Sequence, residues 1–173
     1  MDVEIAGRID KSNPMRADFP SPDHDHGRCS AEVLSHAETL CRERKQRLTP
    51  MRRHVLNALA ASHRPIGAYE IMELVAADGT RPAPITVYRA LDFLIEQGLV
   101  HRIESRNAFL ACARPHDSGA VVAFLICEKC GTVGEAPAGG IMQSVAAAAK
   151  SMGFTAKLSV IEVTGLCAHC RNA

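Results

Sequence analysis

The chain has 173 residues, which allows one medium domain or two small ones. Apolar residues make up 47% of it, aromatics only 4%, and Trp is absent, so its core must consist of Leu, Ile, Val, Ala and Met. The net charge of +1 argues neither for nor against nucleic-acid binding. The first 20 residues carry charges, which excludes a signal peptide, and the longest apolar run, 120–127, is too short to span a membrane. We therefore expect a cytoplasmic protein without a membrane partner.

Residues 1–29 mix Pro, Asp, Ser and His without apolar periodicity and predict a flexible tail. Helical spacing of apolar residues begins after Ser30, which is expected to cap the first helix, and Cys41 is expected to pack under that helix. Thr49 before Pro50 predicts the next helix start, and Gly98 a helix end. After the break near residue 48, the expected helices are 50–61, 68–77 and 85–97.

After Gly98 the apolar period changes to about two residues. Segments 99–103 and 108–112 predict two strands joined by a tight turn at 104–107. Helices followed by such a hairpin predict a winged helix-turn-helix domain over residues 30–113.

A hinge linker is expected over 114–120 and a second domain over 121–173. In that domain an Ala-rich segment, 141–152, has apolar residues on one helical face. Strands are expected at 121–126, 132–135 and, more weakly patterned, 155–165. The fold class is therefore α+β.

Four of the seven cysteines form two C-x-x-C pairs, Cys127 with Cys130 and Cys167 with Cys170. Two thiolates at this spacing in a turn after a strand can point at one metal ion, and two such turns complete a tetrahedral sulfur site. The 36 residues between the pairs leave room for a helix and a strand. We expect structural zinc held by the four sulfurs. The alternative is a redox dithiol, which usually opens a helix in a βαβ unit.

A local basic stretch lies between Arg42 and Arg53, where six basic residues stand against one acid, Glu43. Such a stretch can contact phosphates in a chain of near-neutral charge. On charge alone, a solvated helix face is the better interpretation.

Several segments, in order and at proper spacing, carry a family resemblance. Residues 47–53 (RLTPMRR), 86–91 (TVYRAL) and 127–131 (CEKCG) resemble the ferric uptake regulator (Fur) family. Three segments resemble the zinc uptake regulator (Zur) branch of this family: residues 88–94 (YRALDFL), 98–105 (GLVHRIES) and 165–170 (GLCAHC). The resemblance covers about residues 31–170 and leaves the tail out.

The resemblance implies a homodimer, with residues 121–173 as the dimerisation and metal-binding domain. It implies a transcriptional repressor that binds double-stranded operator DNA of zinc-uptake genes when zinc-loaded and releases it when zinc is scarce. Two zinc ions per subunit are implied, one structural and one regulatory, and neither a small-molecule substrate nor an enzymatic activity is expected.

The family's regulatory site lies at the hinge and uses a His and a Cys of the wing, a linker His, and a Glu after the first C-x-x-C. The usual linker position, seven residues before Cys127, is Ala120 here. We assign its role to His116, the only linker histidine, with Asp117 or water as alternatives. The other matching positions are His101, Cys112 and Glu135. Nitrogen, sulfur and oxygen ligands together suit zinc.

The helix expected at 85–97 is the recognition helix of such a domain, and its first turn would enter the major groove. Arg89 can donate to O6 and N7 of guanine, although a surface ion pair with Asp92 or Glu96 is the alternative. Tyr69 matches a family position that commonly touches DNA. The predicted DNA-contacting residues are Tyr69, Thr86, Tyr88 and Arg89, with Arg52 and Arg53 on phosphates.

Two other functions compete. An iron- or peroxide-responsive regulator of the same family would use a site of His and carboxylates, which the thiol of Cys112 argues against. His36-x-Glu38 with a later C-x-x-C loosely resembles a zinc deaminase, but Ile126 rather than Pro precedes Cys127, and the two parts lie 89 residues apart.

Overall fold

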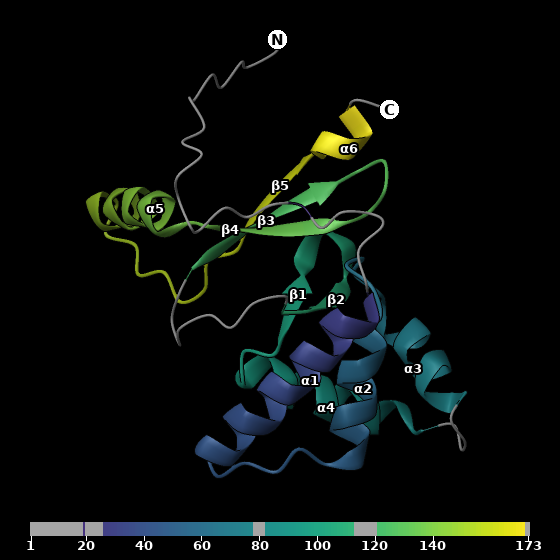
Figure 1. Ribbon diagram of the computed structural model, residues 1–173. Coiled ribbons are helices and arrows are strands. Elements are labelled where there is room, and N and C mark those ends of the chain that lie inside the picture. The colour runs from purple at the N-terminus through teal and green to yellow at the C-terminus, as the bar shows by residue number, and fades with distance from the viewer. Residues whose placement is uncertain (1–18, 20–25, 78–81, 113–120, 172–173) are drawn as a thin grey trace.

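The computed structural model describes residue 19 and residues 26–77, 82–112 and 121–171. Most of the expected tail and the whole expected linker, 114–120, lie outside this part. Figure 1 shows helices α1 to α4 at one end, the β1–β2 hairpin in the middle and a second sheet at the other end. The first domain comprises α1 His26–Glu43, α2 Pro50–Ala60, α3 Ala68–Ala76, α4 Pro84–Glu96, β1 Val100–Ile103 and β2 Ala108–Ala111.

Local capping signals mark two helix ends where they were expected. The Thr49 side chain accepts a hydrogen bond from the amide of Arg52 at 3.5 Å, and Pro50 occupies the first turn of α2. Gly98, with φ of 74°, follows the end of α4 in the left-handed region that glycine adopts at low cost. These two predictions are confirmed.

The predicted start of the first helix is wrong. α1 begins at His26, four residues before Ser30. The Ser30 hydroxyl lies inside the helix and donates to the carbonyl of Ala60 at 2.9 Å, which ties α1 to the end of α2. A tertiary contact rather than a cap therefore explains this serine.

The core of the first domain is mostly aliphatic, as the composition predicts, but it also includes Phe93 and Phe109. The side chains of Leu56, Ile71, Leu91 and Leu94 are at most 1% exposed. Cys41 is buried in the same cluster, so its predicted packing under α1 is confirmed.

The β1–β2 hairpin is the wing of a winged helix. Its strands pair antiparallel, with His101 opposite Leu110, and a single 3₁₀ turn at Glu104–Arg106 joins them. Asn107 closes the turn with φ of 46°, a left-handed conformation that Asn tolerates well. Ile66, ahead of α3, adds an isolated bridge to Phe109. The predicted hairpin and tight turn are confirmed.

The second domain is a mixed sheet with strand order β4-β3-β5. β4 is antiparallel to β3, whereas β5 is parallel to it and requires a crossover, which contains α5. The weakly patterned strand expected at 155–165 is wrong in its first half, because β5 covers only the last five of those residues. The elements are β3 Val122–Cys127, β4 Val133–Pro137, α5 Gly139–Ser151, β5 Ile161–Gly165 and α6 Ala168–Arg171, the last of which was not predicted.

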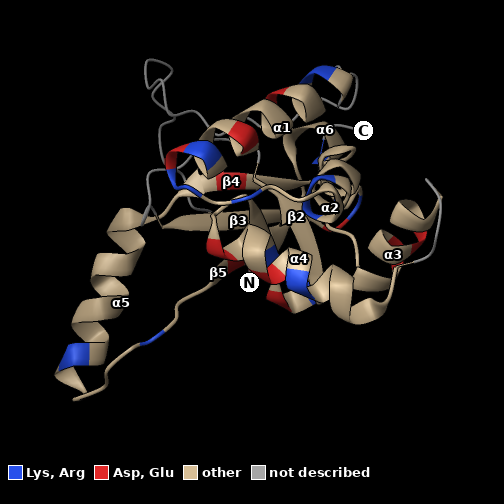
Figure 2. Ribbon diagram, turned by 90° about the horizontal axis from the view of Figure 1, so that it is seen from below, with Lys and Arg blue, Asp and Glu red and all other residues tan. Residues whose placement is uncertain are grey.

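Helix α5 projects away from the rest of the chain in both views (Figures 1 and 2), and none of its residues is buried. Within the described part of the chain, every helix is too short or too polar to cross a membrane.

The two domains share a small apolar interface. Ile103 and Leu110 of the wing pack with three residues of the second sheet, and all five are at most 6% exposed. A backbone hydrogen bond of 3.1 Å from Val133 in β4 to His63 after α2 adds a polar contact. The sheet residues of this cluster are Phe124, Ile126 and Val133. The wing is therefore seated on the second sheet.

Candidate metal centres and DNA-facing surface

The four paired cysteines come together at one end of the second sheet. The parallel register of β3 and β5 places Cys127 beside Gly165, so both C-x-x-C turns leave the sheet at the same edge. All four sulfur atoms lie within 4.8 Å of one another. Gly131, with φ of 76°, allows the first turn to close, and the four-residue helix α6 carries Cys170.

Backbone amides surround these sulfurs. The amide of Cys167 donates to Sγ of Cys127 at 3.4 Å, and that of Cys170 to Sγ of Cys167 at 3.4 Å. The first of these bonds, with the Cys130 amide, lowers the pKa of Cys127 to about 6. Burial, reinforced by the neighbouring thiols, raises the pKa of Cys170 to about 12.

The two shifts have different causes. Backbone amides stabilise the Cys127 thiolate, whereas a Cys170 thiolate would lose hydration and would meet the like charge of Cys127. A divalent cation removes that repulsion, and four sulfurs in a closed tetrahedron suit zinc best. The residues therefore fit a structural zinc ion.

A second group of potential ligands lies where the two domains meet. Nε2 of His101 is 3.8 Å from Oε1 of Glu135, and one ligand atom from each of these residues and from Cys112 lies within 4.8 Å of the others. His101 stands on β1, Cys112 directly follows β2, and Glu135 stands on β4. One nitrogen, one sulfur and one oxygen from two domains thus converge on one point.

Strand geometry explains this convergence. His101 faces Leu110 across the wing, and Cys112, two residues further along, lies on the same face of the hairpin. The amide of Cys112 donates to the carbonyl of Leu99 at 3.0 Å and so continues the ladder. The His101 ring packs on Phe124, with 5.1 Å between ring centroids. Three of the four predicted regulatory ligands are thus brought together; His116, Ala120 and Asp117 lie outside the described residues.

The predicted DNA-contacting side chains of α4 point to solvent. Thr86, Tyr88 and Arg89 are exposed, whereas Val87 and Ala90 in the same helix are buried. Tyr69, at the start of α3, is 75% exposed. No ion pair joins Arg89 to Asp92 or Glu96 within the part of the chain that the structure describes.

The two arginines predicted to meet phosphates have partners in the chain. The guanidinium of Arg52 lies 3.3 Å above the centre of the Phe93 ring, and Arg53 forms an ion pair with Glu38. Figure 2 shows acidic and basic positions interspersed on α1. The phosphate contacts of Arg52 and Arg53 therefore remain predictions, and DNA would have to compete with Glu38 for Arg53.

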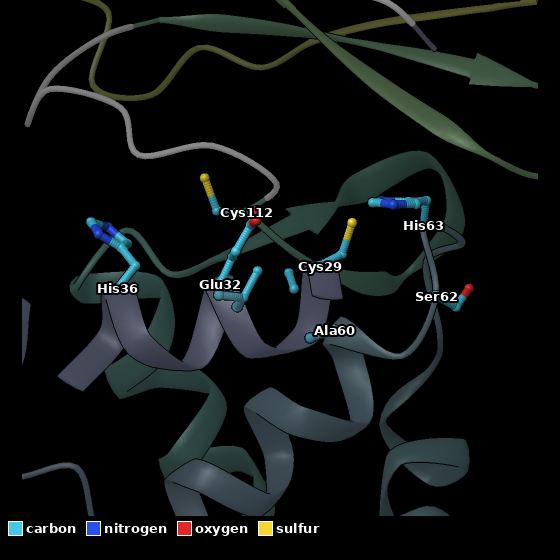
Figure 3. Close-up of a pocket in the computed structure, with 9 residues that line it drawn as sticks. Cys29, Glu32, His36, Ala60, Ser62, His63 and Cys112 are labelled. Carbon is cyan, nitrogen blue, oxygen red and sulfur yellow. The ribbon is translucent and has the colours of Figure 1, made fainter. Parts of the chain in front are cut away.

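Cys112 also lines a cavity of about 230 Å³ whose described lining residues all belong to the first domain. Figure 3 shows Cys29, Glu32 and His36 rising from α1 below it, with His63 on the other side. Neither Cys29 nor His36 belongs to a metal-ligating group within the described residues. The cavity therefore provides open space beside the Cys112 thiol, and its lining forms no third group of potential metal ligands among the described residues.

One interdomain residue was missed at the sequence level. Glu162 on β5 accepts hydrogen bonds from the backbone amides of Glu104 and Ser105 in the wing turn, at 2.7 and 3.1 Å. A single acid in a weakly patterned segment carries no local signal for such a contact.

The fold and the two ligand groups define a two-domain metal-binding protein of the winged-helix class. Comparison with known proteins makes this specific, since the profile of the Ferric uptake regulator family matches residues 43–164. The chain belongs to the ferric uptake regulator family.

The relatives are zinc uptake regulation proteins. The one from Escherichia coli (strain K12) is 41% identical over 139 residues, which is 80% of this chain and 81% of the relative, and the one from Shigella flexneri matches equally well. A solved zinc uptake regulator complexed with zinc and DNA is 40% identical, with a TM-score of 0.78 over 83% of this chain and 95% of that one. Holo XcZur is 41% identical, with a TM-score of 0.75 over 82% and 99%.

Proposed function

We propose that this protein is a zinc-responsive transcriptional repressor that binds operator DNA as a zinc-loaded homodimer and controls zinc-uptake genes. The observation that carries the proposal is the ligand group at the domain junction, His101 and Cys112 on the wing side and Glu135 on the sheet side. A metal ion bound there would favour one angle between reading head and second domain. If only that angle lets both recognition helices of a dimer reach their half-sites, zinc and DNA binding reinforce each other.

Two zinc ions per subunit follow from this proposal. Cys127, Cys130, Cys167 and Cys170 would hold the structural ion, since a closed sulfur site has no open position. The junction group would hold the regulatory ion, with His116 as its fourth ligand and Asp117 or water as the alternatives. The proposal involves no small-molecule substrate or membrane, and a regulator of chromosomal genes works in the cytoplasm.

Zinc is favoured over iron as the signal. The thiol of Cys112 lies within 4.8 Å of the His101 and Glu135 ligand atoms, and a thiolate in a tetrahedral site suits zinc better than harder ions. The relatives at 41% identity are also zinc uptake regulation proteins.

The test is a gel shift on an inverted-repeat DNA duplex selected with the wild-type protein, with zinc and ferrous iron titrated separately. We expect zinc at low free concentration to restore binding to chelator-treated protein that retains its four-cysteine zinc. Restoration by iron alone, or DNA binding indifferent to both metals, would contradict the proposal.

The recognition helix yields a first mutational prediction. Replacing Arg89 by Ala should weaken operator binding by about 1–3 kcal/mol at every zinc concentration, because the loss lies in base contacts and not in metal binding. Competition with duplexes changed at single positions should show relaxed discrimination at one guanine. Lys150→Ala, which removes the same charge from exposed α5, serves as the control. Equal losses in both variants would show that Arg89 contributes only charge.

Dimerisation yields a second prediction. α5 and the segments after it expose apolar side chains that the described part of the chain leaves uncovered: Ile141, Val145, Met152, Phe154, Leu158 and Val163, all 43–83% exposed. Val145→Glu should convert the dimer to a monomer in solution, because a two-fold interface receives each substitution twice. Gln143→Glu, on the opposite side of α5, should remain dimeric. A dimeric Val145→Glu variant would place the interface elsewhere.

A further inference from the structure

One row of residues crosses the second sheet beneath the wing. In the sheet register Phe124 on β3 lies opposite Glu135 on β4 and opposite Glu162 on β5. Residues directly opposite each other share a face of a sheet, so the two carboxylates flank Phe124 on the face that meets the wing. Phe124 belongs to the apolar cluster between the domains, which confirms which face this is.

The wing spans this row from end to end. His101 on β1 meets Glu135 and the Phe124 ring at one end, and the turn that follows β1 meets Glu162 at the other. From His101 to Glu104 a strand advances about 10 Å, at ~3.3 Å per residue. From β4 across β3 to β5 two strand spacings also cover about 10 Å, at ~4.8 Å each. The spacing of the wing contacts therefore matches the spacing of the two carboxylates.

The contact of Glu162 is bidentate. Its Oε1 accepts from the amide of Glu104 at 2.7 Å and its Oε2 from the amide of Ser105 at 3.1 Å. Bonds from backbone donors to an ionised carboxylate are stronger than bonds between neutral groups. The carboxylate of Glu104 itself pairs with Arg102 at 3.2 Å, which offsets the like charge so close to Glu162.

We propose that Glu162 is a positioning residue, a metal-free latch that holds the wing turn on the second sheet and so lets the regulatory ion control the wing angle. This inference rests on the proposed function. The contacts of His101 and the apolar cluster of Ile103 and Leu110 hold the middle of the wing on the sheet, and Glu162 adds a polar contact about 10 Å from His101 that restrains rotation of the wing turn in the plane of the sheet. Glu162 thus favours the closed arrangement in which His101, Cys112 and Glu135 converge, although it belongs to neither ligand group.

Loss of the Glu162 contact should raise the free zinc concentration that operator binding requires, rather than abolish DNA binding. Because zinc and the latch stabilise the same closed state, a weaker latch is compensated by more zinc. Glu162→Ala should raise the free zinc needed for half-maximal operator binding about tenfold, as expected for lost charge-assisted hydrogen bonds. Glu162→Gln, which keeps one acceptor, should show a smaller shift. At saturating zinc both variants should approach the wild-type operator affinity, unlike Arg89→Ala.

The experiment combines two measurements on the full-length dimer. Operator binding to the selected duplex is titrated against buffered free zinc, and hydrogen exchange is followed at the amides of Glu104 and Ser105. Glu43→Gln, which removes an exposed acid from the end of α1, is the control for charge. Four-cysteine zinc content and dimer mass verify that each variant is intact.

We expect faster exchange at both amides in Glu162→Ala, and the zinc shift only in the Glu162 variants. Unchanged exchange, or an unchanged zinc midpoint in a zinc-dependent wild-type protein, would overturn the latch. A wild-type protein that binds DNA without zinc would instead refute the proposed function, and the exchange measurement would still support or reject the Glu162 contact itself.

Discussion

Cys112→Ala is expected to raise the free zinc needed for operator binding by at least about 100-fold, while the protein stays folded and dimeric with its four-cysteine zinc in place. The thiolate is the only sulfur ligand in the junction group of the described residues, and its loss leaves a nitrogen and an oxygen from two different domains. Loss of a mere supporting partner of a metal ligand costs about 10–100-fold in affinity, so loss of the ligand itself should cost more. Zinc titration of operator binding by gel shift measures the effect.

The chain offers a matched control for this variant. Cys41→Ala deletes the same atom from the first domain, at a site that is 2% exposed and belongs to neither ligand group. Each substitution removes one buried sulfur and should cost on the order of 1 kcal/mol of folding free energy. If Cys112→Ala kept the wild-type zinc midpoint, or if Cys41→Ala shifted it equally, the assignment of Cys112 to the regulatory site would fail.

Much of the fold could be predicted because its signals are local. Thr49 with Pro50 starts α2, Gly98 ends α4, and the change of period at the wing strands is contained in the segments themselves. Ser30 shows where this reasoning fails, because its hydroxyl is bonded to Ala60, 30 residues away. β5 is shorter than expected because an alternating pattern marks residues that could pair, whereas the register with β3 decides which ones do.

The candidate sites also divide into those with a local sequence signal and those that depend on long-range contacts. Each C-x-x-C turn is a local feature, so spacing alone predicted the four-cysteine group. The junction group joins Cys112 to Glu135 across two domains, and only a family resemblance could link these residues in advance. Glu162 had no such support, because its role depends on the register of both β4 and β5 with Phe124.

Removing the structural zinc is expected to unfold the second domain, a larger effect than any loss at the junction. The domain's own core is small, since the apolar cluster on its sheet is completed by Ile103 and Leu110 of the wing, and α5 has no buried residue. Structural zinc in small domains contributes on the order of 10 kcal/mol, comparable to the whole stability of a typical domain of about 5–15 kcal/mol. Cys167→Ser replaces a buried thiolate with a hydroxyl, a poor zinc ligand, at the point where β5 meets α6.

We therefore expect Cys167→Ser to lose the four-cysteine zinc, the dimer and the thermal transition of the second domain together. Cys29→Ser, which changes a thiol outside both ligand groups, should retain all three. Since β5 also carries Glu162, release of this strand frees the wing, and added zinc should not rescue operator binding as it does in Cys112→Ala. A folded, dimeric Cys167→Ser protein without zinc would show that the sulfur cluster is dispensable for the fold. Different responses to added zinc in Cys112→Ala and Cys167→Ser would distinguish the role of the ion that sets the wing angle from the role of the ion that stabilises the second domain.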